Sequence, residues 1–104
     1  MNDLLAPLST HLGDQVKAVL AAAGYDMAVR HRKTAKLMRG GCFIRQPEAD
    51  VVLVYHQAFP PSNNTKDRMT WVAKYADALP GHGFTFQTTF TPRGVPYIIV
   101  RRLV

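Results

Sequence analysis

The stretch Val51–Tyr55, which reads Val-Val-Leu-Val-Tyr, decides the fold of this chain because it is apolar at every position. β-Branched and aromatic residues favour extended backbone, and a strand that is apolar on both sides is typical of the middle of a sheet. We therefore predict a central strand over residues 51–57. A turn over residues 47–50, Pro-Glu-Ala-Asp, connects it to a preceding strand over residues 42–46.

Two amphipathic helices are predicted, one on each side of these strands in the sequence. In the first helix, which Gly24 ends, apolar residues recur at three- and four-residue steps. Its apolar stripe consists of Leu5, Leu8, Leu12, Val16, Val19, Leu20 and Ala23. The second helix follows a Pro- and Asn-rich break over residues 59–65, with Asn64 or Thr65 as its cap. Its stripe consists of Met69, Val72, Ala76 and Leu79.

The C-terminal part of the chain has the pattern of a β-hairpin. Phe84, Phe86 and Phe90 occupy every second position on one side of a strand, and the other side is rich in Thr. A turn at residues 92–94, Pro-Arg-Gly, leads into a second strand from Pro96 onward. Three phenylalanines on one side of a strand are expected to face the core.

The segment between the first helix and Cys42 is the least regular. Residues 26–33 alternate so that Arg30 and Arg32 point to the same side, which predicts a strand with a basic outer face. Residues 34–39 are compatible with a short helix or with a basic loop.

These elements predict an α+β fold in the order α-β-β-β-α-β-β. We expect a single domain over residues 1–104, in which two helices pack on one face of a mainly antiparallel sheet of about five strands. In such an arrangement a helix followed by a hairpin occurs twice.

The formal net charge of +6 arises from one window, residues 27–47, which contains six basic residues and no Asp or Glu. The remaining seven Lys and Arg are balanced by seven Asp and Glu. An uncompensated field of one sign favours anionic partners such as phosphates or acidic proteins. We call the six residues the basic window: Arg30, Arg32, Lys33, Lys36, Arg39 and Arg45.

The basic window predicts a small binding protein that is not an enzyme and that contacts the backbone of nucleic acid. A first alternative is an interaction or inhibitor protein, of the phage or mobile-element accessory type, that docks on an acidic partner. Trp71 and Tyr75, four residues apart on the second helix, are then the candidate aromatic interface. A second alternative is a subunit of a symmetric homo-oligomer.

No cofactor or metal site is expected. The four histidines, at positions 11, 31, 56 and 82, do not form a metal-ligand spacing with Cys42, which is interpreted as a small buried hydrophobe. A small nuclease is the enzymatic alternative. It would need Asp26, Glu48 and Asp50 to converge on a divalent ion, or His31 or His56 to act beside the basic window.

A cytoplasmic location is expected. A lone cysteine fits a reducing compartment, and the first residues lack the basic and apolar regions of a signal peptide. Because no apolar run approaches the roughly 20 residues that span a bilayer, no membrane partner is expected.

Overall fold

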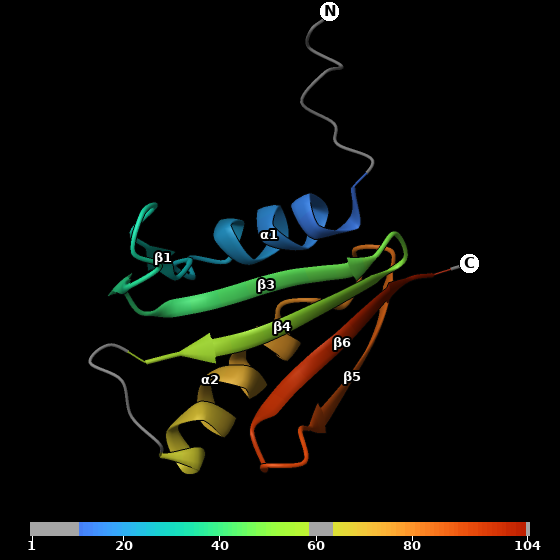
Figure 1. The fold of residues 1–104 in the computed structure, drawn as a ribbon. Coiled ribbons are helices and arrows are strands. Elements are labelled where there is room, and N and C mark those ends of the chain that lie inside the picture. The colour runs from blue at the N-terminus through green and yellow to red at the C-terminus, as the bar shows by residue number, and fades with distance from the viewer. Residues whose placement is uncertain (1–10, 59–63, 104) are drawn as a thin grey trace, which may run out of the picture.

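The computed structural model describes residues 11–58 and 64–103. The predicted stripe residues Leu5 and Leu8 and most of the break over 59–65 lie outside these ranges. The elements are α1 (Leu12–Ala22), β1 (Val29–Arg30), β2 (Leu37–Arg39), β3 (Gly41–Glu48), β4 (Val51–Gln57), α2 (Thr65–Asp77), β5 (Phe84–Phe90) and β6 (Pro96–Arg102) (Figure 1).

Four strands form an antiparallel sheet in the order β3-β4-β6-β5. Strand β4 pairs with β3 on one side and with β6 on the other, so the prediction of a central strand is confirmed. The predicted α+β fold, with two helices on a mainly antiparallel sheet, is confirmed as well. The helix-plus-hairpin unit occurs twice, as α1-β3-β4 and α2-β5-β6, and the two units meet where β4 pairs with β6.

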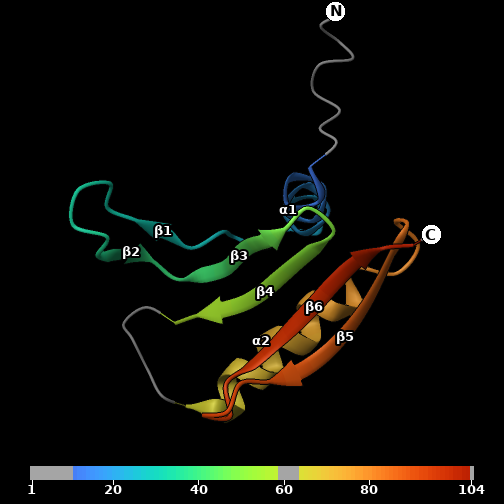
Figure 2. The ribbon, with the colours of Figure 1, turned by 45° about the vertical axis from the view of Figure 1, so that its right-hand side comes forward.

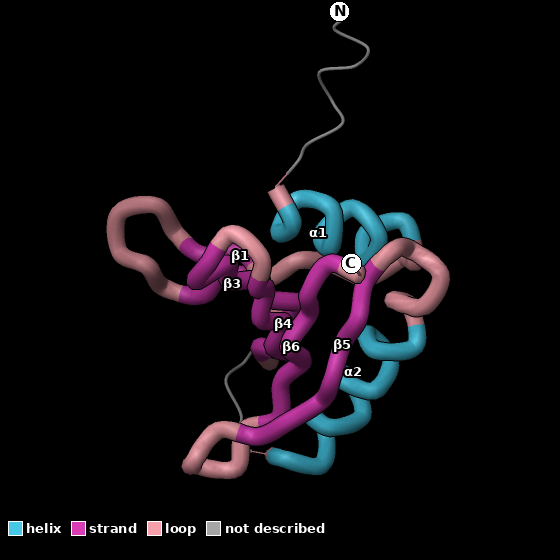
Figure 3. The backbone as a smooth tube through the Cα atoms, turned by 90° about the vertical axis from the view of Figure 1, so that its right-hand side faces the viewer, coloured by secondary structure: helices cyan, strands magenta, loops and turns pink. Residues whose placement is uncertain are grey.

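Both helices lie on the same side of the sheet (Figure 3). Their fully buried residues are Leu12, Val16 and Leu20 from α1 and Val72 and Tyr75 from α2, and Leu79, just after the end of α2, is buried with them. The sheet contributes Cys42, Val52, Val54, Ile98 and Val100 to the same core. These strand residues stand at alternating positions, so the residues between them point to the opposite side, which no described helix covers. We call this side the open face.

The end of α1 follows from the glycine that the sequence places there. Gly24 adopts a φ of 94°, a left-handed conformation that glycine takes without steric cost. Its N–H donates to the carbonyl of Ala21 (3.0 Å), and the N–H of Tyr25 donates to that of Leu20 (3.1 Å). This pair of bonds is a Schellman motif, which satisfies carbonyls that the helix leaves open.

The start of α2 is capped as predicted. The side chain of Asn64 accepts a hydrogen bond from the N–H of Asp67 at 3.1 Å, so Asn64 rather than Thr65 is the N-cap. The apolar face of α2 differs from the predicted stripe. Tyr75 is 1% exposed whereas Met69 is 46% exposed, because the helix is rotated so that Val72, Tyr75 and Leu79 face the sheet.

Residues 26–39 contain a further hairpin, β1–β2, rather than one strand followed by a helix or loop. β1 covers only Val29 and Arg30, and it pairs with β2 through Val29–Arg39 and Arg30–Leu37. The strand stops after Arg30 because the ring Nδ1 of His31 accepts hydrogen bonds from the N–H groups of Lys33 (3.2 Å) and Thr34 (3.4 Å). These local bonds close a turn. Figure 2 shows this hairpin extending beyond the four-stranded sheet.

The predicted position of Arg32 is therefore wrong. The sequence pattern put Arg30 and Arg32 on one side of a single strand, but Arg32 lies in the turn that follows β1. The alternation of residues 26–33 therefore does not fix the direction of the Arg32 side chain. Residues 11–58 and 64–103 form six strands in two sheets, where the sequence predicted about five in one sheet.

Candidate functional site

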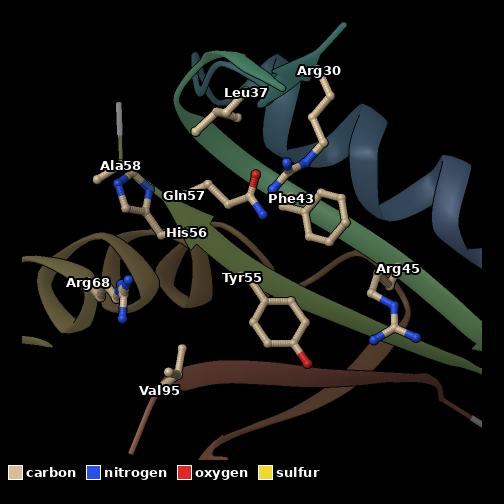
Figure 4. A pocket seen from close by; sticks show the side chains of 10 residues that line it. All are labelled: Arg30, Leu37, Phe43, Arg45, Tyr55, His56, Gln57, Ala58, Arg68 and Val95. Atoms are coloured by element: carbon tan, nitrogen blue, oxygen red, sulfur yellow. The ribbon is translucent and has the colours of Figure 1, made fainter. Parts of the chain in front are cut away.

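A cavity of about 660 Å³ opens on the molecule where the β1–β2 hairpin meets the open face (Figure 4). Side chains from β1 to β4, α2 and the turn before β6 surround it. They are Arg30, Leu37, Phe43, Arg45, Tyr55, His56, Gln57, Ala58, Arg68 and Val95. A volume of this size is in the range of small-ligand sites in proteins.

The cavity is strongly basic. Arg30, Arg45 and Arg68 come from β1, β3 and α2, and none of the described residues that line the cavity is acidic. Arg30 is fixed in place, because its Nη1 donates to the carbonyl of Ala35 at 2.8 Å and its guanidinium carbon lies 5.9 Å from the centroid of the Phe43 ring. Three guanidinium groups among described lining residues that include no Asp or Glu create a positive potential that attracts anions.

The structure brings two residues of the basic window together and separates the other four. Arg30 and Arg45 line the cavity, and Arg68, from outside the window, joins them. Arg39 lines a second cavity of about 770 Å³, whose walls also include Trp71 and Lys74. The remaining three, Arg32, Lys33 and Lys36, are exposed on the segment that joins β1 to β2.

A row of three aromatic rings crosses the open face beside the cavity. Phe43 on β3 is paired directly with Tyr55 on β4, and their ring centroids are 6.3 Å apart. The ring of Tyr55 stacks with that of Tyr97 on β6, with centroids 5.0 Å apart and planes 19° apart. All three side chains are partly buried. We call Phe43, Tyr55 and Tyr97 the aromatic strip.

Sequence reasoning assigned the aromatic residues of the sheet differently. It expected Phe84, Phe86 and Phe90 to face the core. Phe84 and Phe86 do pack against the core, whereas Phe90 is 48% exposed near the end of β5. The strip itself was not identified, because its residues come from three strands and gather only through the register of the sheet.

A buried polar group of the cavity has no hydrogen-bond partner among the described residues. Gln57 lies on the open face of β4, and its Oε1 is buried without a hydrogen bond from any described residue. Buried polar atoms of proteins are nearly always hydrogen-bonded, and the exceptions often belong to sites that await a ligand or a water molecule. A ligand in the cavity with an N–H or O–H group can satisfy this oxygen.

Trp71 and Tyr75 do not form the exposed pair that the sequence suggested. Tyr75 is 1% exposed, and its hydroxyl lies 2.7 Å from Nδ1 of His56, so it belongs to the core. Trp71 is 37% exposed and stacks on the ring of His56, with centroids 5.1 Å apart and planes 7° apart. The ammonium of Lys74 lies 4.5 Å from the centroid of the Trp71 ring. Of the proposed interface pair, only Trp71 is available to a partner.

Burial in this aromatic cluster lowers the pKa of His56, and the positive charge of Arg68 lowers it further against a smaller opposing effect of Asp67. His56 is therefore neutral at pH 7. The unfolded chain protonates its histidine at a pKa near 6.5, above the folded value, so protons bind preferentially to the unfolded state. We expect the free energy of unfolding to fall as the pH drops below about 6.5.

Substitution of His56 tests this expectation. A His56→Phe variant keeps a ring against Trp71 but cannot take up a proton, so its stability should vary less with pH between about 5 and 7 than that of the parent protein. Urea unfolding across this pH range measures the effect, with His82→Phe, at an exposed turn position, as control. An unchanged pH dependence in His56→Phe would assign the effect to another group.

Cys42 is a buried hydrophobe, as expected from the sequence. It is 1% exposed, and burial raises its pKa to about 12, so the thiol stays protonated at neutral pH. Although Cys42 pairs directly with His56 across β3 and β4, no three His, Cys, Asp or Glu side chains in the described part of the chain gather closely enough to hold a metal ion. Asp26, Glu48 and Asp50 therefore do not converge as a metal-dependent nuclease would require.

No protein-family model matches this sequence, and neither a curated protein nor a solved structure matches it. Within residues 11–58 and 64–103, no helix is long and apolar enough to cross a membrane.

Proposed function

We propose that this protein binds nucleic acid at the cavity beside the open face of its sheet, where the β1–β2 hairpin lies. One observation carries the proposal: Arg30, Arg45 and Arg68 reach the cavity from three separate elements, and none of the described residues that line it is acidic. Guanidinium groups match phosphate oxygens through paired N–H donors. The three side chains are the phosphate contacts, and the role of the protein is binding rather than catalysis.

Binding through phosphates makes affinity depend on salt, because each contact releases counterions from the nucleic acid. For a single strand the slope of log affinity against log salt is about −0.7 per phosphate, so three contacts give a slope of about −2. Fluorescence anisotropy of labelled oligonucleotides between about 50 and 200 mM salt measures this slope. We expect an Arg45→Gln variant to bind more weakly and with a slope that is shallower by about 0.7.

Lys17→Gln is the matched control. Lys17 is exposed on α1 and does not line the cavity, and its substitution removes one positive charge, as Arg45→Gln does. The proposal predicts that Lys17→Gln leaves both the affinity and the slope close to those of the parent. Equal losses in the two variants would indicate that only net charge matters. Absence of binding at low salt would rule the function out, and tighter binding to an acidic polypeptide would favour the protein-partner alternative.

A further inference from the structure

We infer that the nucleic acid bound here is single-stranded and that its bases stack on the aromatic strip of Phe43, Tyr55 and Tyr97. This inference rests on the proposed function. The arginines are proposed to bind the phosphates of the nucleic acid, and the inference names the residues that bind its bases. A single strand offers phosphates and unpaired bases together. The open face offers guanidinium groups and aromatic rings together.

The strip places three aromatic rings next to one another on a partly exposed surface. Its three rings lie on the adjacent strands β3, β4 and β6, with neighbouring centroids 6.3 Å and 5.0 Å apart. They stay partly exposed because both helices pack on the other side of the sheet. Aromatic side chains of this kind stack with the bases of single strands in a way that tolerates any sequence, since every base has a π face.

The phosphate-binding groups are placed along the strip. Arg45 is two residues from Phe43 on the same side of β3, and the guanidinium of Arg30 lies 5.9 Å from the Phe43 ring. Arg101 is two positions from Ile99 on the open side of β6, where it pairs with Val51 of β4. A chain that alternates a phosphate with a base can therefore contact charge and rings within one face.

Gln57 adds a group that can read the edge of a base. Its Oε1 has no donor among the described residues, and the exocyclic amino groups of adenine, cytosine and guanine and the N3–H of thymine are donors. In a single strand these edges are free, whereas in a duplex most of them are used in pairing.

Other occupants fit this face less well. A duplex presents only its backbone to a sheet surface, because its bases are already stacked on one another, and it would leave the strip uncovered. A second copy of the chain, related by a twofold axis, would bring equivalent basic side chains together across the contact. Like charges at such short range oppose association. The combination of arginines and rings therefore favours a single strand over a duplex or a dimer.

Binding by three ligands of equal length tests the inference: a labelled single strand of thymidines, a duplex, and a strand of abasic sites. We expect the protein to bind the thymidine strand most tightly. Tyr55→Leu and Tyr97→Leu should each weaken that binding roughly 5- to 100-fold. Their affinity for the abasic strand should not change. Tyr55→Phe and Tyr97→Phe keep the rings and should bind as the parent does. A uridine strand in place of thymidine distinguishes RNA from DNA as the preferred source.

The possible outcomes separate the two proposals. If Arg45→Gln weakens binding but Tyr55→Leu and Tyr97→Leu do not, nucleic-acid binding stands and base stacking is overturned. Equal affinity for duplex and single strand overturns base stacking as well. No binding by the parent protein overturns both. Circular dichroism of each variant verifies folding, and two separate Tyr positions guard against one that fails to fold. A dimer that Tyr55→Leu dissociates would make the open face a self-interface and refute the inference.

Discussion

Replacing Gly41 by alanine is expected to lower the free energy of unfolding by about 3 to 5 kcal/mol, from backbone strain and overpacking together. Gly41 begins β3 with a φ of 145°, a conformation that side chains rarely adopt. An added Cβ would overlap the carbonyl oxygen of Asp26 and would lie 3.1 Å from the carbonyl carbon of Met27. Both of these atoms belong to the backbone, which cannot move aside as a flexible side chain can.

The close approach at Gly41 exists because the chain leaving α1 is bonded to β3. The N–H of Cys42 donates to the carbonyl of Asp26, and the N–H of Ala28 donates to that of Cys42, both at 2.8 Å. These two bonds attach the β1–β2 hairpin, and with it Arg30, to the sheet. Displacing the segment in Gly41→Ala should therefore weaken oligonucleotide binding in addition to stability.

Gly94→Ala provides the control for Gly41→Ala. Gly94 also has a positive φ, 82°, but nothing lies within 4 Å of an added Cβ. This variant carries only the conformational strain, about 1 kcal/mol. Denaturant unfolding compares the two, with the midpoint as the readout. If both variants lose a similar amount of stability, the backbone around Asp26 moves to accommodate the added Cβ and does not hold the β1–β2 hairpin in place.

Local patterns were sufficient to predict most of the fold. Alternation and turn residues placed β3, β4 and the β5–β6 hairpin, because a period of two and turn-forming residues are properties of short segments. Gly24 and Asn64 marked helix ends for the same reason. The β1–β2 hairpin was not predicted, since its turn depends on a ring nitrogen of His31 that accepts two backbone N–H groups. No composition rule anticipates that arrangement.

The candidate site was harder to predict because it depends on register and on layer order. The basic window is contiguous in sequence, yet Arg39 faces a different cavity from Arg30, and Arg68 comes from α2. The strand over residues 51–55 is apolar on both sides, which indicates a central position but does not reveal that one side stays uncovered. Tyr55 and Tyr97 became neighbours only through the pairing of β4 with β6.

Replacing either of two adjacent isoleucines on β6 by alanine tests whether the open face is uncovered in solution. The replacement on the core side is expected to cause the second large loss of stability. Ile98 is 0% exposed and lies in the core between the sheet and the helices. Truncating a fully buried isoleucine to alanine removes buried apolar surface and leaves a cavity, which costs about 2 to 5 kcal/mol. We expect Ile98→Ala to fall near the middle of this range, which is a large part of the 5 to 15 kcal/mol typical of small domains.

Ile99→Ala makes the same chemical change one residue further along, on the side without helices. Ile99 is only partly buried there, paired with Leu53, so its truncation should cost about 1 kcal/mol or less. Urea unfolding at two protein concentrations compares both variants with the parent. If Ile99→Ala proves as costly as Ile98→Ala, and the loss varies with protein concentration, a second copy covers this face in solution. The arginines and the aromatic strip would then lie inside a subunit interface, and single-stranded nucleic acid would have no access to them.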